Sequence, residues 1–155
     1  MASTVSPFQL EAALNQGAPS PLYLVVGEED LLRDHALAVL KTKILGDGGE
    51  FNYDLFYGDE AGGSDIRSCA AEIPVFAERR LVVVKAADKL PAREGEALLD
   101  YVKEPVETTT LVFVGPKLDG RMKFSQALGR AAVTVDCAPL REAQLLPWIA
   151  REAER

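Results

Sequence analysis

Histidine and cysteine are scarce in this sequence, and their scarcity excludes several kinds of functional site. The chain has one histidine, His35, and two cysteines, Cys69 and Cys137, at no close spacing. Such a set predicts neither a zinc site nor a disulfide framework. His35 falls in a helical pattern and is expected to pack or to face solvent, while both cysteines are expected to be small, reduced core residues. The sequence therefore predicts no metal site and no catalytic thiol or imidazole.

Long apolar runs and targeting signals are also missing. No run approaches the roughly 18 apolar residues that a membrane-spanning helix needs. Residues 1–6 hold no basic region followed by an apolar stretch, so they do not have the pattern of a signal peptide. We expect a cytoplasmic protein without membrane contact.

Positive charge is in deficit. The chain has 17 lysines and arginines against 24 aspartates and glutamates, which gives a net charge of −7, and it has no dense basic cluster. Because an acidic domain repels the phosphate backbone, direct contact of this segment with DNA is not expected.

Apolar runs that alternate with helical patterns make up most of the chain. The 155 residues, 48% of them hydrophobic, can form one domain with a sizeable core and the start of another. Apolar runs predict strands at residues 22–26, 81–84, 110–114 and 132–135, and an alternating pattern predicts one at residues 51–57. Helical spacing predicts helices at residues 30–45, 66–71, 93–102 and 123–128, and a last helix from about 141 to 155. This alternation predicts βαβ units with right-handed crossovers, and hence a three-layer α/β domain with a parallel sheet.

Two local patterns refine this prediction. Ser64 is expected to cap the helix at residues 66–71. In the predicted strand at residues 51–57, aromatic and apolar residues alternate with Asn52 and Asp54. That alternation favours an edge strand with one face in water.

The turn after the first predicted strand is where a nucleotide-binding α/β domain carries its phosphate loop. A phosphate loop needs glycines that expose backbone amides and a lysine that meets the phosphates. Here the turn contains a single glycine, Gly27. Carboxylates follow it at Glu28, Glu29 and Asp30, and they repel a nucleotide while favouring the start of a helix. Lys85 stands where a nucleotide hydrolase needs a magnesium-binding acid, so we expect neither a functional ATP site nor enzymatic activity.

The connection between the helix at residues 66–71 and the next strand mixes apolar and charged residues. Pro74 disfavours continuation of the helix. Val75 and Phe76 come next, shortly before the charged residues 78–80. Two interpretations remain open at this point. Phe76 can pack beneath the sheet as part of the core, or Val75 and Phe76 can project as an anchor for a partner's pocket.

A set of stretches, in this order along the chain, resembles the delta subunit of the bacterial DNA polymerase III clamp loader. The stretches are residues 22–32, 73–80, 81–84, 112–119 and 146–149. The connector with Val75 and Phe76 and the start of the last helix carry most of the resemblance. Here Leu146-Pro147 is followed directly by Trp148, without the residue that usually intervenes in the family.

The resemblance implies an AAA+-like (P-loop NTPase-like) α/β domain at residues 1–139, without a functional phosphate loop. Residues 140–155 would then form the first helix of the family's helical lid domain, whose remainder is missing from this chain. The family's delta subunit grips the DNA sliding clamp, the beta ring, through hydrophobic residues at the end of a helix. These clamp-binding residues correspond here to Ile73, Pro74, Val75 and Phe76.

The function that the resemblance implies is binding of the clamp and help in opening the ring for loading onto primed DNA. It implies no cofactor and no catalysis by this chain. Contact with the other clamp-loader subunits would be made through C-terminal domains that are missing here.

A receiver-like or degenerate nucleotide-binding α/β domain is the alternative interpretation. Glu28 and Glu29 after the first strand, Asp88 after the third and Lys117 after the fourth resemble a receiver's acidic pocket. A receiver, however, needs its lysine after the fifth strand, where Asp136 stands. A magnesium titration separates the two interpretations.

Overall fold

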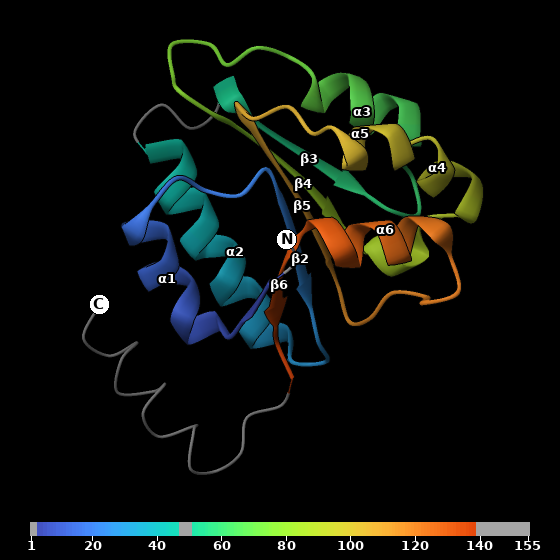
Figure 1. Cartoon of the computed structure of the whole chain (residues 1–155), viewed down its shortest axis with the longest axis horizontal. Helices are drawn as coiled ribbons and strands as arrows, with labels where there is room; N and C mark the ends of the chain where they lie inside the picture. Colours follow the sequence, from blue (N-terminus) through green and yellow to red (C-terminus); the bar gives the residue numbers. More distant parts are fainter. Residues whose placement is uncertain (1–2, 47–50, 139–155) are drawn as a thin grey trace.

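The computed structural model describes residues 3–46 and 51–138. Its centre is a six-stranded sheet with the order β1-β6-β2-β5-β4-β3, in which every pair of neighbours is parallel (Figure 1). The strands are β1 (Ser3–Val5), β2 (Leu22–Val26), β3 (Tyr53–Tyr57), β4 (Arg80–Lys85), β5 (Thr109–Gly115) and β6 (Val133–Asp136).

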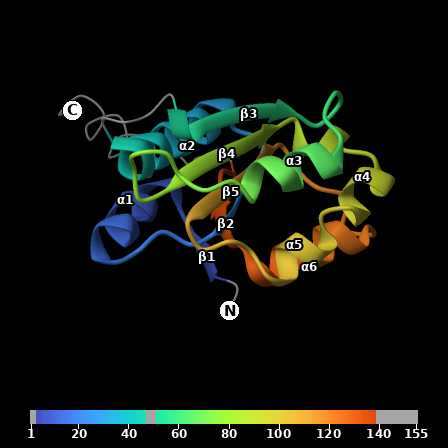
Figure 2. The same ribbon diagram turned by 90° about the horizontal axis from the view of Figure 1, so that it is seen from above.

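Helices cover both faces of this sheet, as Figure 2 shows. The helices are α1 (Pro7–Gln16), α2 (Asp30–Leu45), α3 (Gly63–Ala70), the 3-10 turn η2 (Ala87–Lys89), α4 (Ala92–Glu96), α5 (Leu99–Lys103) and α6 (Lys123–Ala131). Helices α1 and α2 lie on one face, and α3 to α6 lie on the other. The predicted three-layer α/β architecture with a parallel sheet is therefore confirmed.

Side chains of the central strands alternate between the two helical layers. In β2, Leu22 and Leu24 pack towards α3 and α6, whereas Tyr23 and Val25 pack towards α1 and α2. β4 and β5 repeat this alternation, so each central strand is buried on both sides. This double burial is why these strands appear in the sequence as continuous apolar runs.

Some predicted elements differ in detail from the structure. The helix expected at residues 93–102 is split into α4 and α5. Ser64 does not cap α3, because the helix already begins at Gly63 and its N-cap is Gly62. The backbone N–H of Gly63 instead donates to the Glu94 side chain of α4, at 3.0 Å. The Glu94 carboxylate, from another helix, thus accepts from the start of α3 in place of the predicted Ser64 hydroxyl.

Two elements at the start of the chain were not predicted. β1 is only three residues long and extends the sheet beyond β6. α1 follows it with a capping box, in which the Ser6 hydroxyl accepts from the Gln9 amide and the Gln9 side chain accepts from the Ser6 amide. The helix predicted at the end of the chain lies outside the described residues.

β3 is an edge strand, as predicted, but its dry and wet residues were assigned wrongly. Leu55 and Tyr57 are exposed, while Asn52 is buried. The reason is that α2 lies over β2, β4 and β5 and leaves this part of the edge strand uncovered. Within the described ranges, no helix is both long enough and apolar enough to cross a membrane.

Candidate functional site

The parallel sheet sorts the loops into two groups. Turns that follow the strands gather at the carboxyl edge of the sheet, and turns that precede the strands gather at the amino edge. Ligands of open α/β sheets usually bind at the carboxyl edge. The connector of residues 71–79 enters β4 at the amino edge.

At the carboxyl edge, the turn after β2 is tied to the ends of β5 and β6 by backbone hydrogen bonds. The Gly27 amide donates to the Pro116 carbonyl at 3.1 Å, and the Glu29 amide donates to the Cys137 carbonyl at 3.2 Å. The Cys137 amide in turn donates to the Val26 carbonyl at 2.7 Å. Backbone amides in this position cradle the phosphates in a phosphate loop. Here those of Gly27 and Glu29 are paired with the protein's own carbonyls.

Gly27 allows this close approach. Its φ is 145°, and a Cβ at this position would overlap the carbonyl group of Cys137. Arg33, on the first turn of α2, reinforces the turn by donating to the Gly27 carbonyl and by forming an ion pair with Asp30. The turn is thus held by its own backbone and by one largely buried guanidinium.

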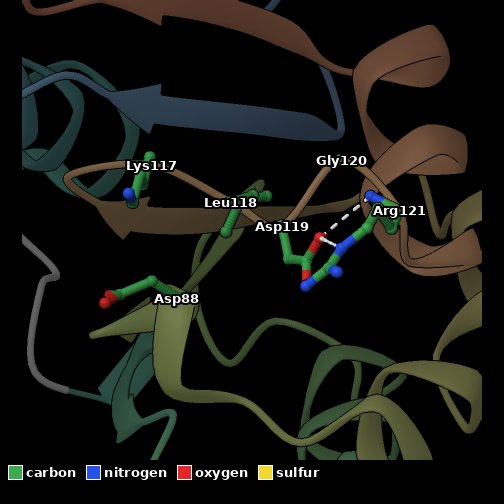
Figure 3. A pocket seen from close by; sticks show the side chains of 6 residues that line it. All are labelled: Asp88, Lys117, Leu118, Asp119, Gly120 and Arg121. Atoms are coloured by element: carbon green, nitrogen blue, oxygen red, sulfur yellow. Dashed lines mark hydrogen bonds and ion pairs between the residues drawn. The ribbon is translucent and has the colours of Figure 1, made fainter.

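An open pocket of about 440 Å³ lies further along the same edge, lined in part by Asp88, Lys117, Asp119 and Arg121 (Figure 3). Arg121 binds the Asp119 carboxylate with two side-chain nitrogens, each at 3.0 Å. Hydrogen bonds from the Arg121 side chain and backbone hold the pKa of Asp119 below its usual range. In Figure 3 the dashed lines join only this pair, and Asp88 and Lys117 stand apart from it. Across the described part of the chain, no group of three or more His, Cys, Asp or Glu residues could hold a metal ion.

At the amino edge, the connector forms the long loop at the top of Figure 1. Its apolar side chains face solvent, with 82% of Ile73, 45% of Val75 and 102% of Phe76 exposed. Pro74 is half-buried between them. The interpretation of Phe76 as a core residue is therefore wrong for this structure. The other interpretation, a projecting apolar anchor, agrees with the geometry.

Phe76 also has an unusual backbone. Its φ is 54°, in the left-handed region, which among the described non-glycine residues only Ala86 shares. For a residue with a Cβ this conformation costs roughly 1–2 kcal/mol. Such strain persists only where the surrounding structure holds it, and it is frequent at binding sites.

Hydrogen bonds and ion pairs with neighbouring segments hold the connector. Asn52, just before β3, forms two hydrogen bonds with the backbone of Val75: its side-chain NH₂ donates to the carbonyl at 2.8 Å, and its side-chain oxygen accepts from the amide at 2.7 Å. Near the end of the connector, the Arg79 guanidinium donates to the Glu107 carbonyl at 2.7 Å.

The beginning of the connector is held by Arg80, a buried residue at the start of β4. Its guanidinium forms ion pairs with Asp54 of β3 and, at 3.4 Å, with Glu72 of the connector. It also lies 3.7 Å from the Cys69 sulfur. Burial, together with the neighbouring Asp54 carboxylate, raises the pKa of the Cys69 thiol to about 11. A raised pKa keeps the thiol protonated at neutral pH, which disfavours a role of Cys69 as a nucleophile.

Comparison with known proteins decides the family. The sequence model of the family described as "DNA polymerase III, delta subunit" matches residues 23–138. The chain belongs to this family. A curated relative, DNA polymerase III subunit delta of Bacillus subtilis strain 168, is 28% identical over 144 residues, which cover 86% of this chain and 42% of that protein. This delta-family chain thus spans less than half the length of that relative.

Solved structures show the same fold. The DNA clamp loader delta protein of Bacillus subtilis has a TM-score of 0.80 at 24% identity, covering 92% of this chain and 45% of that chain. Cdc6p of Pyrobaculum aerophilum has a TM-score of 0.56 at 15% identity, covering 96% of this chain and 48% of that chain. The delta-family domain therefore has an AAA+-like, P-loop NTPase-like α/β fold.

Sequence reasoning missed the residues that support the connector. Asn52, Asp54 and Arg80 appeared as ordinary strand or loop residues, and only the polarity of Asn52 and Asp54 among aromatic and apolar neighbours set those two apart. The partners of Asn52 and Arg80 lie 23 and 26 residues away in the chain, at Val75 and Asp54. Periodicity within one segment cannot reveal such pairs.

Proposed function

We propose that this chain binds the DNA sliding clamp through Ile73, Pro74, Val75 and Phe76, and that it helps to open the ring for loading onto primed DNA. Membership of the delta-subunit family supports this proposal. The observation that carries it is the side chain of Phe76, fully exposed on a connector that side-chain hydrogen bonds hold in place.

Burial of these side chains in a partner's pocket supplies the binding energy. Removing apolar surface from water contributes about 25 cal/mol per Å². Truncation of an aromatic anchor at the centre of an interface often costs about 2 kcal/mol or more of binding free energy. A connector that is already ordered loses less conformational entropy on binding. For the ring to open, the chain must bind the open-competent clamp more tightly than the closed one.

The carboxyl edge supports a role without ATP hydrolysis by this chain. The amides of Gly27 and Glu29 are already paired with carbonyls of the protein. The side chain of Arg33, which neutralises Asp30, also contacts the turn. Nothing in this arrangement favours the alternative of a receiver-like or degenerate nucleotide-binding domain. A cytoplasmic location, and contacts with the other loader subunits through further domains, belong to the same proposal.

Calorimetric titration of the intact protein with its cognate sliding clamp tests the proposal. We expect the Val75→Ala, Phe76→Ala double variant to lose at least about 2 kcal/mol of binding free energy, or roughly 30-fold in affinity. Leu31→Ala is the control. Like Val75 and Phe76, Leu31 is an exposed apolar residue, but it lies near the start of α2, at the opposite edge of the sheet. Its affinity should stay within about twofold of wild type, a change well below 1.4 kcal/mol. A folded double variant that keeps its affinity would overturn the proposal.

A further inference from the structure

Asn52 has an unusual position for a polar residue. It precedes the edge strand β3 and is only 1% exposed, although the preceding Phe51 is in solvent. Its side-chain amide has one partner residue, Val75, to which it both donates at 2.8 Å and accepts at 2.7 Å. Both polar functions of a buried amide are therefore used on the backbone of a single residue of the connector.

Backbone hydrogen bonds contribute little to holding the connector. Among the described residues, no backbone–backbone hydrogen bond involves residues 73–79. The nearest ones are those from Glu72 to Cys69 and from Arg80 to Thr108, at either end of the connector. The two bonds from Asn52 therefore take the place of the strand or turn pairing that normally fixes a chain segment.

We propose that Asn52 is a positioning residue that holds the connector in its binding-competent conformation. By fixing the amide and carbonyl of Val75, it sets the backbone immediately before Phe76, whose left-handed φ of 54° directs the ring into solvent. Without Asn52 the connector samples other conformations, and only the competent fraction can bind a partner. The part of this inference that concerns clamp affinity rests on the proposed function; the part that concerns connector order does not.

The first test uses the unmodified protein and needs no partner. Amide hydrogen exchange, followed residue by residue by nuclear magnetic resonance, should show a protected Val75 amide within an otherwise unprotected connector. The amides of Phe76, Ala77 and Glu78 should exchange at the rate of a free chain, since none of them has a backbone acceptor among the described residues. If the Val75 amide exchanges as fast as these three, the proposal is wrong.

The second test is Asn52→Ala. We expect exchange of the Val75 amide to accelerate at least about tenfold, while the core amide of Val83 in β4 keeps its protection. A merely structural role would accelerate both amides together. In the same variant the affinity for the sliding clamp should fall about tenfold.

Thr110→Val is the matched control for loss of a buried polar side chain at the same edge. Thr110 is buried, and its hydroxyl donates to the Ser20 carbonyl at 3.2 Å rather than to the connector. This variant should leave both Val75 exchange and clamp affinity unchanged. If Asn52→Ala frees the Val75 amide without lowering clamp affinity, positioning of the binding site is refuted. If wild type itself does not bind the clamp, the proposed function fails, and hydrogen exchange still decides whether Asn52 orders the connector.

Discussion

The two edges of one parallel sheet are built in opposite ways. At the carboxyl edge, backbone hydrogen bonds join the turn after β2 to the ends of β5 and β6, so the main chain itself closes the turn. At the amino edge, residues 73–79 of the connector form no backbone–backbone hydrogen bond with any described residue, and the connector presents apolar side chains to solvent. Hydrogen bonds of side chains, those of Asn52 and of the connector's own Arg79, hold this second edge.

The difference teaches that the edge where ligands of this fold usually bind can be closed while the opposite edge presents apolar side chains to solvent. In parallel α/β sheets the carboxyl edge usually binds ligands because loops and helix N-termini converge there. Here the amides at that position are engaged, and the surface best suited to a partner lies at the opposite end of the strands. Changes at the carboxyl edge should therefore affect mainly stability, and changes at the amino edge should affect mainly binding.

The largest effect is expected for Gly27→Ala. The added Cβ overlaps the Cys137 carbonyl and the residue keeps a φ of 145°, so the free energy of unfolding should fall by about 3 kcal/mol. Gly17→Ala is the control, since nothing lies within 4 Å of its added Cβ; it should change stability by no more than about 0.5 kcal/mol. Urea denaturation measures both. Equal stabilities would mean that the turn after β2 is not closed as described.

A smaller effect is expected for Phe76→Asn, which should weaken clamp binding and raise the stability of the fold. Clamp affinity should fall roughly 30-fold, or about 2 kcal/mol, because the aromatic anchor is lost. The free energy of unfolding should rise by up to about 1 kcal/mol, since asparagine tolerates the left-handed backbone better than phenylalanine does. Calorimetry with the clamp and urea denaturation give the two values. A drop in stability would contradict the view that Phe76 is strained for binding.

The next effect concerns pH and the carboxyl edge. Burial raises the pKa of the Cys137 thiol from 9.0 to about 12. Above pH 9 the unfolded chain therefore releases this proton before the folded one does, and stability should fall as pH rises from about 9 towards about 12.

The measurement is a difference between wild type and Cys137→Ala. On going from pH 8 to pH 10, wild type should lose about 1 kcal/mol more unfolding free energy than the variant, which has no thiol at this position. Urea denaturation at each pH provides the values. Parallel pH profiles would mean that Cys137 ionises as readily in the folded chain as in the unfolded one.

The smallest effect is expected for added nucleotide and magnesium, which should leave the melting temperature nearly unchanged. ATP with magnesium, or magnesium alone, at millimolar concentration should shift the melting temperature by less than about 1 °C, because a ligand stabilises only a state that binds it. Differential scanning calorimetry is the measurement. A reproducible rise with magnesium would favour the receiver-like alternative, and a rise that needs ATP would mean that the turn after β2 opens to admit a nucleotide.

The predicted strands were recovered because the central ones are buried on both faces and so leave continuous apolar runs in the sequence. The edges of the fold were harder to predict. β1 is too short to leave a pattern, and Asn52 was placed on the wet side of β3 although it is buried. The start of α3 depends on Glu94, which reaches it from another helix. The predicted domain boundary near residue 139 and the lid helix beyond it stay predictions.

For the candidate site, the sequence by itself determined the ingredients: an apolar Val75-Phe76 pair after Pro74, and a turn with a single glycine and a run of acids after the first apolar strand. These are properties of neighbouring residues, which a linear pattern contains. The tertiary structure alone decided that Phe76 is exposed rather than buried, because the surroundings of the connector come from segments distant in the chain, such as Asn52, which pairs with Val75 23 residues further along. It also decided that the turn after β2 is closed, because its acceptors come from Pro116 and Cys137, which the fold of the sheet brings beside it.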